Sequence, residues 1–206
     1  MHPNFTIISG GQTGPDTAAL KTAISHRIPY TGFVPHGFTN ERGRISDAYI
    51  SSPYGSLRET GPPDASESTE NAERTRLNCE DADGLLTLAF CKPEELHLVS
   101  RGTELGVATG LGERREMYFV DLRRFMEDPE GEVAGVMKWL DETNIEKCAI
   151  GGPRESEEPG VEAETEAFLG KVWDKAKERG WKSIRFGGVV PRGKIEPFLR
   201  DNRWTS

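Results

Sequence analysis

Short apolar runs alternate with longer stretches of helical pattern along the chain. Four runs rich in β-branched and aromatic residues predict buried strands at Phe5–Ile8, Leu85–Phe90, Met117–Val120 and Cys148–Ile150. The stretches between and after them predict helices at Thr17–Arg27, Glu67–Glu80, Gly102–Leu111, Glu132–Glu142 and Val161–Arg179. Apolar strands that alternate with helices are typical of a parallel sheet covered on both faces. We therefore expect a doubly wound α/β fold with a mainly parallel sheet.

The last predicted helix is amphipathic, and two other stretches lack a clear pattern. Its apolar stripe consists of Val161, Thr165, Phe168, Leu169, Val172 and Ala176. Val34–Pro63 is rich in glycine and proline and is too long for a plain connection, which indicates an irregular functional loop. The C-terminal extension, residues 181–206, would form an edge strand or contact a neighbouring subunit. We expect residues 1–206 to form a single domain.

Three glycine-rich turns carry the main functional signal. The first, Gly10–Asp16, follows the first strand; the second, Ser100–Glu104, opens a helix; the third, Gly151–Ser156, follows the last strand. Glycines allow close approach of a ligand, and the free N–H groups of a helix N-terminus favour an anion. Because the strand-to-helix turns of a parallel sheet share one edge, we expect all three to meet around one cleft.

Arginines add positive charge to this predicted cleft. Arg101 and Arg154 lie in the second and third turns, and the segments expected to overhang the cleft contribute Arg42, Arg44, Arg58 and Arg74. Arg42, Arg44 and Arg58, each taken alone, are at least as often solvated surface charges. A cationic cleft fits a small ligand that bears a phosphate or another oxyanion. No catalytic serine motif is legible, and the histidines and cysteines lack metal-ligand spacing, so we predict no metal site.

Composition narrows the class of partner. Lys and Arg number 26 against 34 Asp and Glu, which gives a net charge of −8 and makes the chain a poor binder of nucleic acid. No apolar run of about 18 residues and no signal-peptide pattern is present, which argues against a membrane protein. The three cysteines, Cys79, Cys91 and Cys148, are typical of free thiols. We expect a cytoplasmic protein.

Several motifs follow one another in the order of a known family. The most specific are Ile8–Asp16 with Ala18–Leu20, and Gly152–Ser156 with Pro159–Gly160. Weaker matches are Gly32–Gly37, Leu57–Thr60, Arg74–Thr75 with Asn78, Asp81–Leu86, Gly102–Thr103 and Val120–Leu122. With these motifs the sequence resembles the family of molybdenum carrier proteins, a circularly permuted branch of the LOG-like Rossmann superfamily. The resemblance covers roughly residues 5–170.

This resemblance implies a Rossmann-like subunit that forms homo-oligomers, either dimers or tetramers. It also implies binding of the molybdenum cofactor, a phosphate-bearing pterin, for storage or delivery to molybdoenzymes. The matching positions that would line the site are Gly11, Gln12, Thr13, Gly14, Arg74, Asn78, Gly102, Thr103, Gly152 and Arg154. The turns themselves add Gly10 and Arg101 as candidates, and Arg101 stands where the family more often has a second glycine.

Two other functions stay open. The LOG-type phosphoribohydrolases release a base from a nucleoside monophosphate and place a glutamate three residues after a Gly-Thr pair. Here that position is Gly106, and Glu104 follows Thr103 directly. The missing carboxylate favours a carrier over an enzyme, with a nucleotide hydrolase and a sensor of a nucleotide derivative as the alternatives.

Overall fold

A seven-stranded sheet forms the centre of the computed structural model, which describes residues 5–61 and 67–181. The strands lie in the order β5–β6–β2–β1–β9–β7–β8. Their bounds are Thr6–Ile8 (β1), Tyr30–Val34 (β2), Ser51–Ser52 (β5), Gly55–Glu59 (β6), Gly84–Ala89 (β7), Glu116–Asp121 (β8) and Lys147–Gly151 (β9). All neighbours pair in parallel except β5 with β6. A separate ribbon pairs Thr39–Asn40 (β3) with Gly43–Arg44 (β4).

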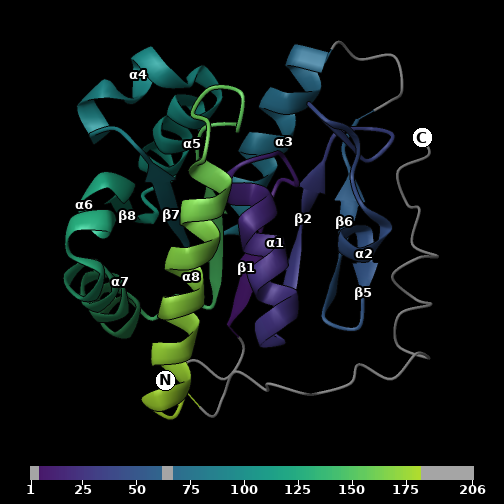
Figure 1. Cartoon of the computed structure of the whole chain (residues 1–206). Coiled ribbons are helices and arrows are strands. Elements are labelled where there is room, and N and C mark those ends of the chain that lie inside the picture. The colour runs from purple at the N-terminus through teal and green to yellow at the C-terminus, as the bar shows by residue number, and fades with distance from the viewer. Residues whose placement is uncertain (1–4, 62–66, 182–206) are drawn as a thin grey trace.

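Helices cover both faces of this sheet. They are Pro15–His26 (α1), Asp47–Ile50 (α2), Glu67–Asp81 (α3), Leu96–Val99 (α4), Arg101–Gly112 (α5), Leu122–Glu127 (α6), Pro129–Thr143 (α7) and Val161–Glu178 (α8), with a 3-10 turn at Pro93–Glu95. Helix α8 packs between α1 and α7, whereas α3 packs on α5. Figure 1 shows α1 and α8 in front of the sheet and α3 and α5 behind it. The predicted doubly wound α/β fold is confirmed.

Burial explains why the apolar pattern gives these elements. Every residue of β7 is buried, as a central parallel strand requires. The predicted stripe of α8 is buried along its whole length, and Phe168 meets Phe125 edge to face at 5.1 Å. Each such large apolar side chain stabilises the fold by roughly 1.5–3 kcal/mol. The main core therefore lies between the sheet and the α1–α8–α7 layer.

The interpretation of Val34–Pro63 as one irregular loop is wrong. Within it lie the ribbon β3–β4, the helix α2 and the strands β5 and β6. Strand β2, which ends at Val34, was also absent from the predicted strands. The C-terminal extension lies outside the described residues beyond Trp181. Among residues 5–61 and 67–181, no helix is long and apolar enough to cross a membrane.

The connections place a crevice at one edge of the sheet. Neighbouring strands β9 and β7 are followed by helices on opposite faces, α8 in front and α5 behind (Figure 1). Ligands of open α/β sheets bind where the connections diverge in this way, outside the carboxyl ends of the strands. The candidate site lies at this position.

Candidate functional site

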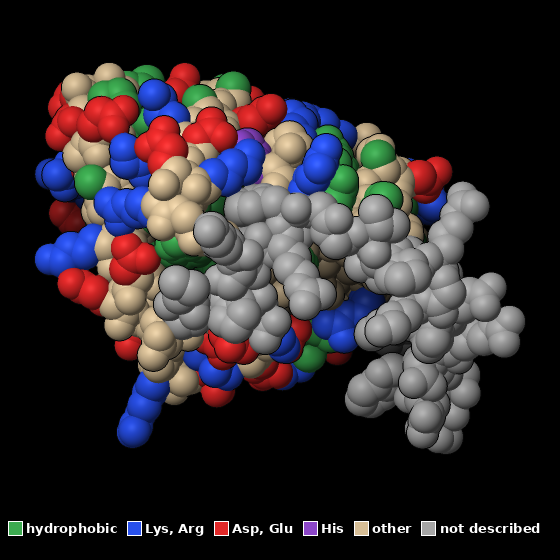
Figure 2. Space-filling model, turned by 90° about the horizontal axis from the view of Figure 1, so that it is seen from below, with side chains coloured by type: hydrophobic (Ala, Val, Ile, Leu, Met, Phe, Trp, Pro, Cys, Tyr) green, Lys and Arg blue, Asp and Glu red, His purple; other side chains and the backbone are tan. Residues whose placement is uncertain are grey.

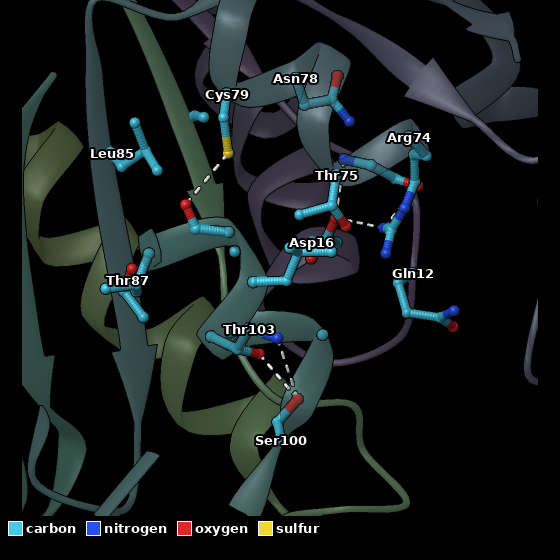
Figure 3. Close-up of a pocket in the computed structure, with 18 of the residues that line it drawn as sticks. Gln12, Asp16, Arg74, Thr75, Asn78, Cys79, Leu85, Thr87, Ser100 and Thr103 are labelled. Carbon is cyan, nitrogen blue, oxygen red and sulfur yellow. Dashed lines mark hydrogen bonds and ion pairs between the residues drawn. The ribbon is translucent and has the colours of Figure 1, made fainter. Parts of the chain in front are cut away.

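A pocket of about 530 Å³ lies between α3, α5, the carboxyl ends of β1 and β9 and the first half of β7. All three glycine-rich turns contribute to its lining, although they are remote in sequence. The predicted site residues that line it are Gly10, Gln12, Arg74, Asn78, Arg101, Gly102, Thr103, Gly152 and Arg154. Figure 3 shows Gln12 and Arg74 on one side and Thr87 on the other, with Thr103 at the start of α5. The expected meeting of the turns is therefore what the structure shows, and the binding role of these residues stays a prediction.

The second turn presents an open helix N-terminus to the pocket. Ser100 caps α5: its hydroxyl oxygen accepts from the Thr103 N–H at 3.3 Å and from the Thr103 hydroxyl at 2.9 Å (Figure 3). The N–H groups of Arg101 and Gly102 precede the first intrahelical bonds and have no acceptor within the helix. A Cβ atom at Gly102 would have no neighbour within 4 Å. This N-terminus can therefore be approached by an anion.

Two arginines at the pocket have no partner among residues 5–61 and 67–181. Within the described ranges, the guanidinium groups of Arg101 and Arg154 form neither a hydrogen bond nor an ion pair. The charged residues of the lining are three arginines and one aspartate, Asp16, which is paired with Arg74. The pocket therefore has two positive charges left over. At the opposite edge of the sheet, Figure 2 shows acidic and basic side chains interspersed where described residues are visible.

The first turn differs, because the protein itself supplies acceptors for its N–H groups. These bonds run from Gly10 to Asp16 Oδ1 (2.7 Å), Gly11 to Ser9 Oγ (3.2 Å), Thr13 to Gln12 Oε1 (3.0 Å) and Gly14 to Glu162 Oε2 (3.5 Å). The Asp16 carboxylate also accepts from the backbone of Gln12. The expectation that this turn cradles a phosphate with free N–H groups is thus not met in the structure.

Three predicted residues of the first turn lie away from the pocket. Gly11, Thr13 and Gly14 are not part of its lining. The Thr13 hydroxyl donates to Glu41 and accepts from the Glu155 N–H at 3.1 Å, so it connects segments of the protein. Gln12 does line the pocket. Its side-chain oxygen accepts two N–H groups, which leaves its NH₂ group for a ligand.

A buried ion pair forms the wall beside Gln12. Arg74 Nη1 lies 3.4 Å from Asp16 Oδ1 and donates to the Gly10 carbonyl at 3.2 Å. Burial raises the pKa of Asp16, against the opposing effect of Arg74, and the same burial lowers the pKa of the Arg74 guanidinium. Arg74 Nε is buried without a partner among the described residues. Arg74 therefore holds the first turn in place and keeps one donor unused.

Asn78 is at the pocket wall, but its amide is engaged. Its Oδ1 accepts from the Phe33 N–H at 2.8 Å, and its Nδ2 donates to the Phe33 carbonyl at 2.9 Å. Thr31, two residues earlier, pairs with β1. Asn78 thus takes the place of a strand partner after β1 has ended. Asn78 therefore has a structural role, and its predicted role in orienting a ligand stays a prediction.

Arg42, Arg44 and Arg58 do not reach the pocket. Arg42 pairs with Glu162 at 2.8 Å and Arg44 with Asp47 at 3.1 Å. Arg58 lies over the Phe33 ring at 4.1 Å and near Asp81. Of the four arginines expected to overhang the cleft, only Arg74 belongs to its lining.

The floor of the pocket consists of residues that the sequence interpretation missed. Apolar side chains from three strands and from α5 form most of it: Ile8, Leu85, Leu86, Ala149, Ile150, Leu105 and Val107. Thr87 is the one polar side chain of β7 and also lines the pocket. The sequence signal for Thr87 as a lining residue is its position as a single threonine within an apolar strand. The floor suits the face of a ring, whose polar edge would then need partners elsewhere in the pocket.

Among the described residues, no unpaired carboxylate lines the pocket. Glu104 is exposed and lies outside the lining, and the position three residues after Thr103 is the buried Gly106. Asp16, the single acidic residue of the lining, is committed to Arg74 and to backbone N–H groups. The described part of the site therefore offers donors and positive charge, with little means of proton transfer.

The comparisons agree with the fold and with the motifs. The profile of the circularly permutated YpsA SLOG family matches residues 7–173. The chain is similar to the 1.45 Å crystal structure of a "putative molybdenum carrier protein" from Syntrophus aciditrophicus SB. The two are 30% identical, with a TM-score of 0.68, and the match covers 84% of this chain and 97% of that one. No curated protein matches. The chain therefore belongs to the circularly permutated YpsA SLOG family.

Proposed function

We propose that this chain binds the molybdenum cofactor and carries it without altering it. The observation that supports this most is the pair of unpartnered arginines, Arg101 and Arg154, beside the open N-terminus of α5. A phosphate monoester carries a charge of about −1.5 to −2 at neutral pH, which two guanidinium groups balance. The similar crystal structure is that of a "putative molybdenum carrier protein", a name that points to a cargo containing molybdenum.

The two halves of the pocket would bind different parts of the cofactor. Arg101, Arg154 and the N–H groups at the start of α5 would hold the phosphate, because charge-assisted hydrogen bonds are the strong ones. The apolar floor around Leu85 and Ile150 would contact the ring, and the Gln12 NH₂ group and Thr87 would meet its polar edge. A volume of about 530 Å³ lies within the usual range for small-molecule sites.

A carrier requires affinity and no chemistry. The single acidic residue of the lining, Asp16, is held by Arg74 and by Gly10, so the described residues of the pocket offer no free general base. We further propose a homo-oligomer that transfers the cofactor to molybdoenzymes. We place it in a reducing compartment, because Cys79, Cys91 and Cys148 are free thiols.

Titration of the purified chain tests this proposal. We expect saturable binding of the molybdenum cofactor under anaerobic conditions, and much weaker binding of a pterin without the phosphate. AMP serves as the comparison, because the anion site by itself does not distinguish one ring from another. Absence of saturable cofactor binding would remove the proposed function.

A nucleotide hydrolase is the second candidate, and the observation in its favour is that Asp16 lines the pocket with a raised pKa. A carboxyl group that gains a proton more easily can act as a general acid. Incubation with AMP, followed by chromatography for free adenine, decides between the two functions. Release of adenine would show that the chain is a hydrolase and not a carrier. A sedimentation coefficient that changes when AMP is added would indicate a sensor.

A further inference from the structure

The ribbon β3–β4 fastens the first turn to the segments beyond β9. Three consecutive residues at its tip each make a contact outside the ribbon. Asn40 Nδ2 donates to the Gly11 carbonyl at 3.0 Å, and Arg42 Nη1 pairs with Glu162 of α8 at 2.8 Å. Glu41, between them, contacts the first and the third glycine-rich turns. The ribbon therefore acts as a strap across segments that are about 140 residues apart in sequence, as the Thr13–Glu155 separation of 142 shows.

Glu41 is the centre of this strap. Its Oε1 accepts from the Thr13 hydroxyl and from the Ser156 N–H at 3.2 Å, and its Oε2 accepts from the Ser156 hydroxyl. Its own N–H donates to Gln12 Oε1 at 3.0 Å. One residue thus bonds to two residues of the first turn and to Ser156 in the third.

The carboxylate of Glu41 remains ionised near neutral pH. Burial alone raises its pKa, but the hydrogen bonds from Ser156 and Thr13 and the charge of Arg154 outweigh burial and hold the pKa below its ordinary value. Arg154 acts on Glu41 electrostatically without an ion pair to any described residue. The Arg154 guanidinium therefore lies near the charge of Glu41 and also lines the pocket.

We propose that Glu41 is a positioning residue that holds the first and third turns together, so that Gln12 and Arg154 face the same ligand. This inference rests on the proposed function for the identity of the ligand. Arg154 is two residues before Ser156, and the Gln12 oxygen that Glu41 engages fixes the direction of the Gln12 NH₂ group. Glu41 itself does not line the pocket and acts through these neighbours.

Hydrogen exchange tests the strap without any ligand. In Glu41→Gln the charge is lost, and we expect amides of residues 12–13 and 152–157 to exchange at least about tenfold faster. Glu59→Gln is the matched control. Glu59 contacts the Gly37 N–H and His36, which lie just before the ribbon, but it contacts neither the first nor the third turn. Unchanged exchange in Glu41→Gln, or an equal increase in Glu59→Gln, would overturn the proposal.

A double-mutant cycle tests whether Glu41 acts through Arg154. We expect Glu41→Gln to weaken binding of the molybdenum cofactor about tenfold in the wild-type chain. In an Arg154→Ala background the further loss should be clearly smaller, since one of the two groups that Glu41 positions is absent. An equal loss in both backgrounds, or tighter binding by Glu41→Gln, would overturn the proposal. A wild-type chain that does not bind the cofactor would remove the proposed function, and the exchange result would still decide the strap.

Discussion

The first and second glycine-rich turns occupy the same edge of one sheet, yet they differ in whether their N–H groups already have acceptors within the protein. Each leads into a helix N-terminus, where an anion is favoured. At the first turn, α8 packs on α1 and brings Glu162 to the Gly14 N–H, so the protein provides the anion. At the second turn, α5 packs on α3, which contributes Asn71, Ala72 and Thr75 to the lining and no carboxylate. Glycine content alone therefore does not mark a ligand site.

The same contrast holds for the arginines. Arg74, beside the first turn, is buried and committed to Asp16 and the Gly10 carbonyl. Arg101 is exposed at the second turn and has no partner among the described residues. The first turn is thus a structural element that shapes one wall, whereas the second turn provides open donors. Substitutions at the two turns should therefore separate stability from binding.

The largest effect is expected from Arg74→Met. Removal of one partner leaves the Asp16 carboxylate buried without its cation, which typically costs about 3–5 kcal/mol. Urea unfolding measures this loss. Arg76→Met is the control on the same helix, because Arg76 forms only an exposed pair with Glu80 and should change stability by less than about 0.5 kcal/mol. Equal, small effects would show that the first turn does not depend on the buried pair.

Gly14→Ala should cost somewhat less, about 2–3 kcal/mol. Gly14 has a φ of 78° and a ψ of −140°, which L-residues avoid, and a Cβ there would overlap the Pro153 carbonyl. Gly102→Ala is the matched substitution at the second turn. It has open space around it, so its free energy of unfolding should stay within about 0.5 kcal/mol of wild type. Thermal and urea denaturation measure the stability of both variants. An equal loss of stability in Gly14→Ala and Gly102→Ala would contradict the comparison.

Arg101→Ala and Arg154→Ala should each weaken cofactor binding by about 10- to 100-fold, the usual range for a lost charge-assisted hydrogen bond. Their stability should remain near wild type, because neither side chain has an ion pair in the described structure. Arg124→Ala, at an exposed arginine that pairs with Glu132 away from the pocket, serves as the control by isothermal titration calorimetry. Undiminished affinity in both arginine variants would place the anion elsewhere.

The smallest effect is a pH-dependent one at Glu162. Burial raises the pKa of Glu162, but Lys21 and Arg42 outweigh it and hold the pKa below the ordinary 4.5. The stabilisation is therefore present above pH 4.5 and is lost as the pH falls through the lowered value of the folded state. Glu162→Gln should cost about 1 kcal/mol at pH 7 and converge with wild type in acid. Glu164→Gln, in the same helical turn, should show a smaller difference; a constant gap at all pH values would refute the assignment.

The apolar pattern predicts the central strands and the long helices, but not the edge of the sheet beyond β1. Strand β2 alternates buried and half-buried residues and contains Gly32, so it lacks a continuous apolar run. Strand β6 has polar or charged side chains at Ser56, Arg58 and Glu59 and lies beside the short hairpin strand β5. Such strands owe their conformation to pairing with a neighbour, which a local pattern does not contain.

The position of the pocket can be predicted from the sheet topology. Which of its N–H donors are free for a ligand cannot. A parallel sheet brings the three turns to one edge, and the sequence is sufficient to predict that. The acceptor for the Gly14 N–H comes from Glu162, 148 residues later, and Asn78 engages Phe33 across 45 residues. Only the folded chain reveals that these contacts occupy the first turn and leave the second open.

A crystal structure with bound molybdenum cofactor tests the central claim most directly. The account predicts that the phosphate lies within hydrogen-bonding distance of the Arg101 and Gly102 N–H groups and of the Arg154 guanidinium, with the Asp16–Arg74 pair intact. A phosphate bound in the Gly10–Gly14 turn, with Glu162 or Asp16 displaced from its N–H donors, would contradict it.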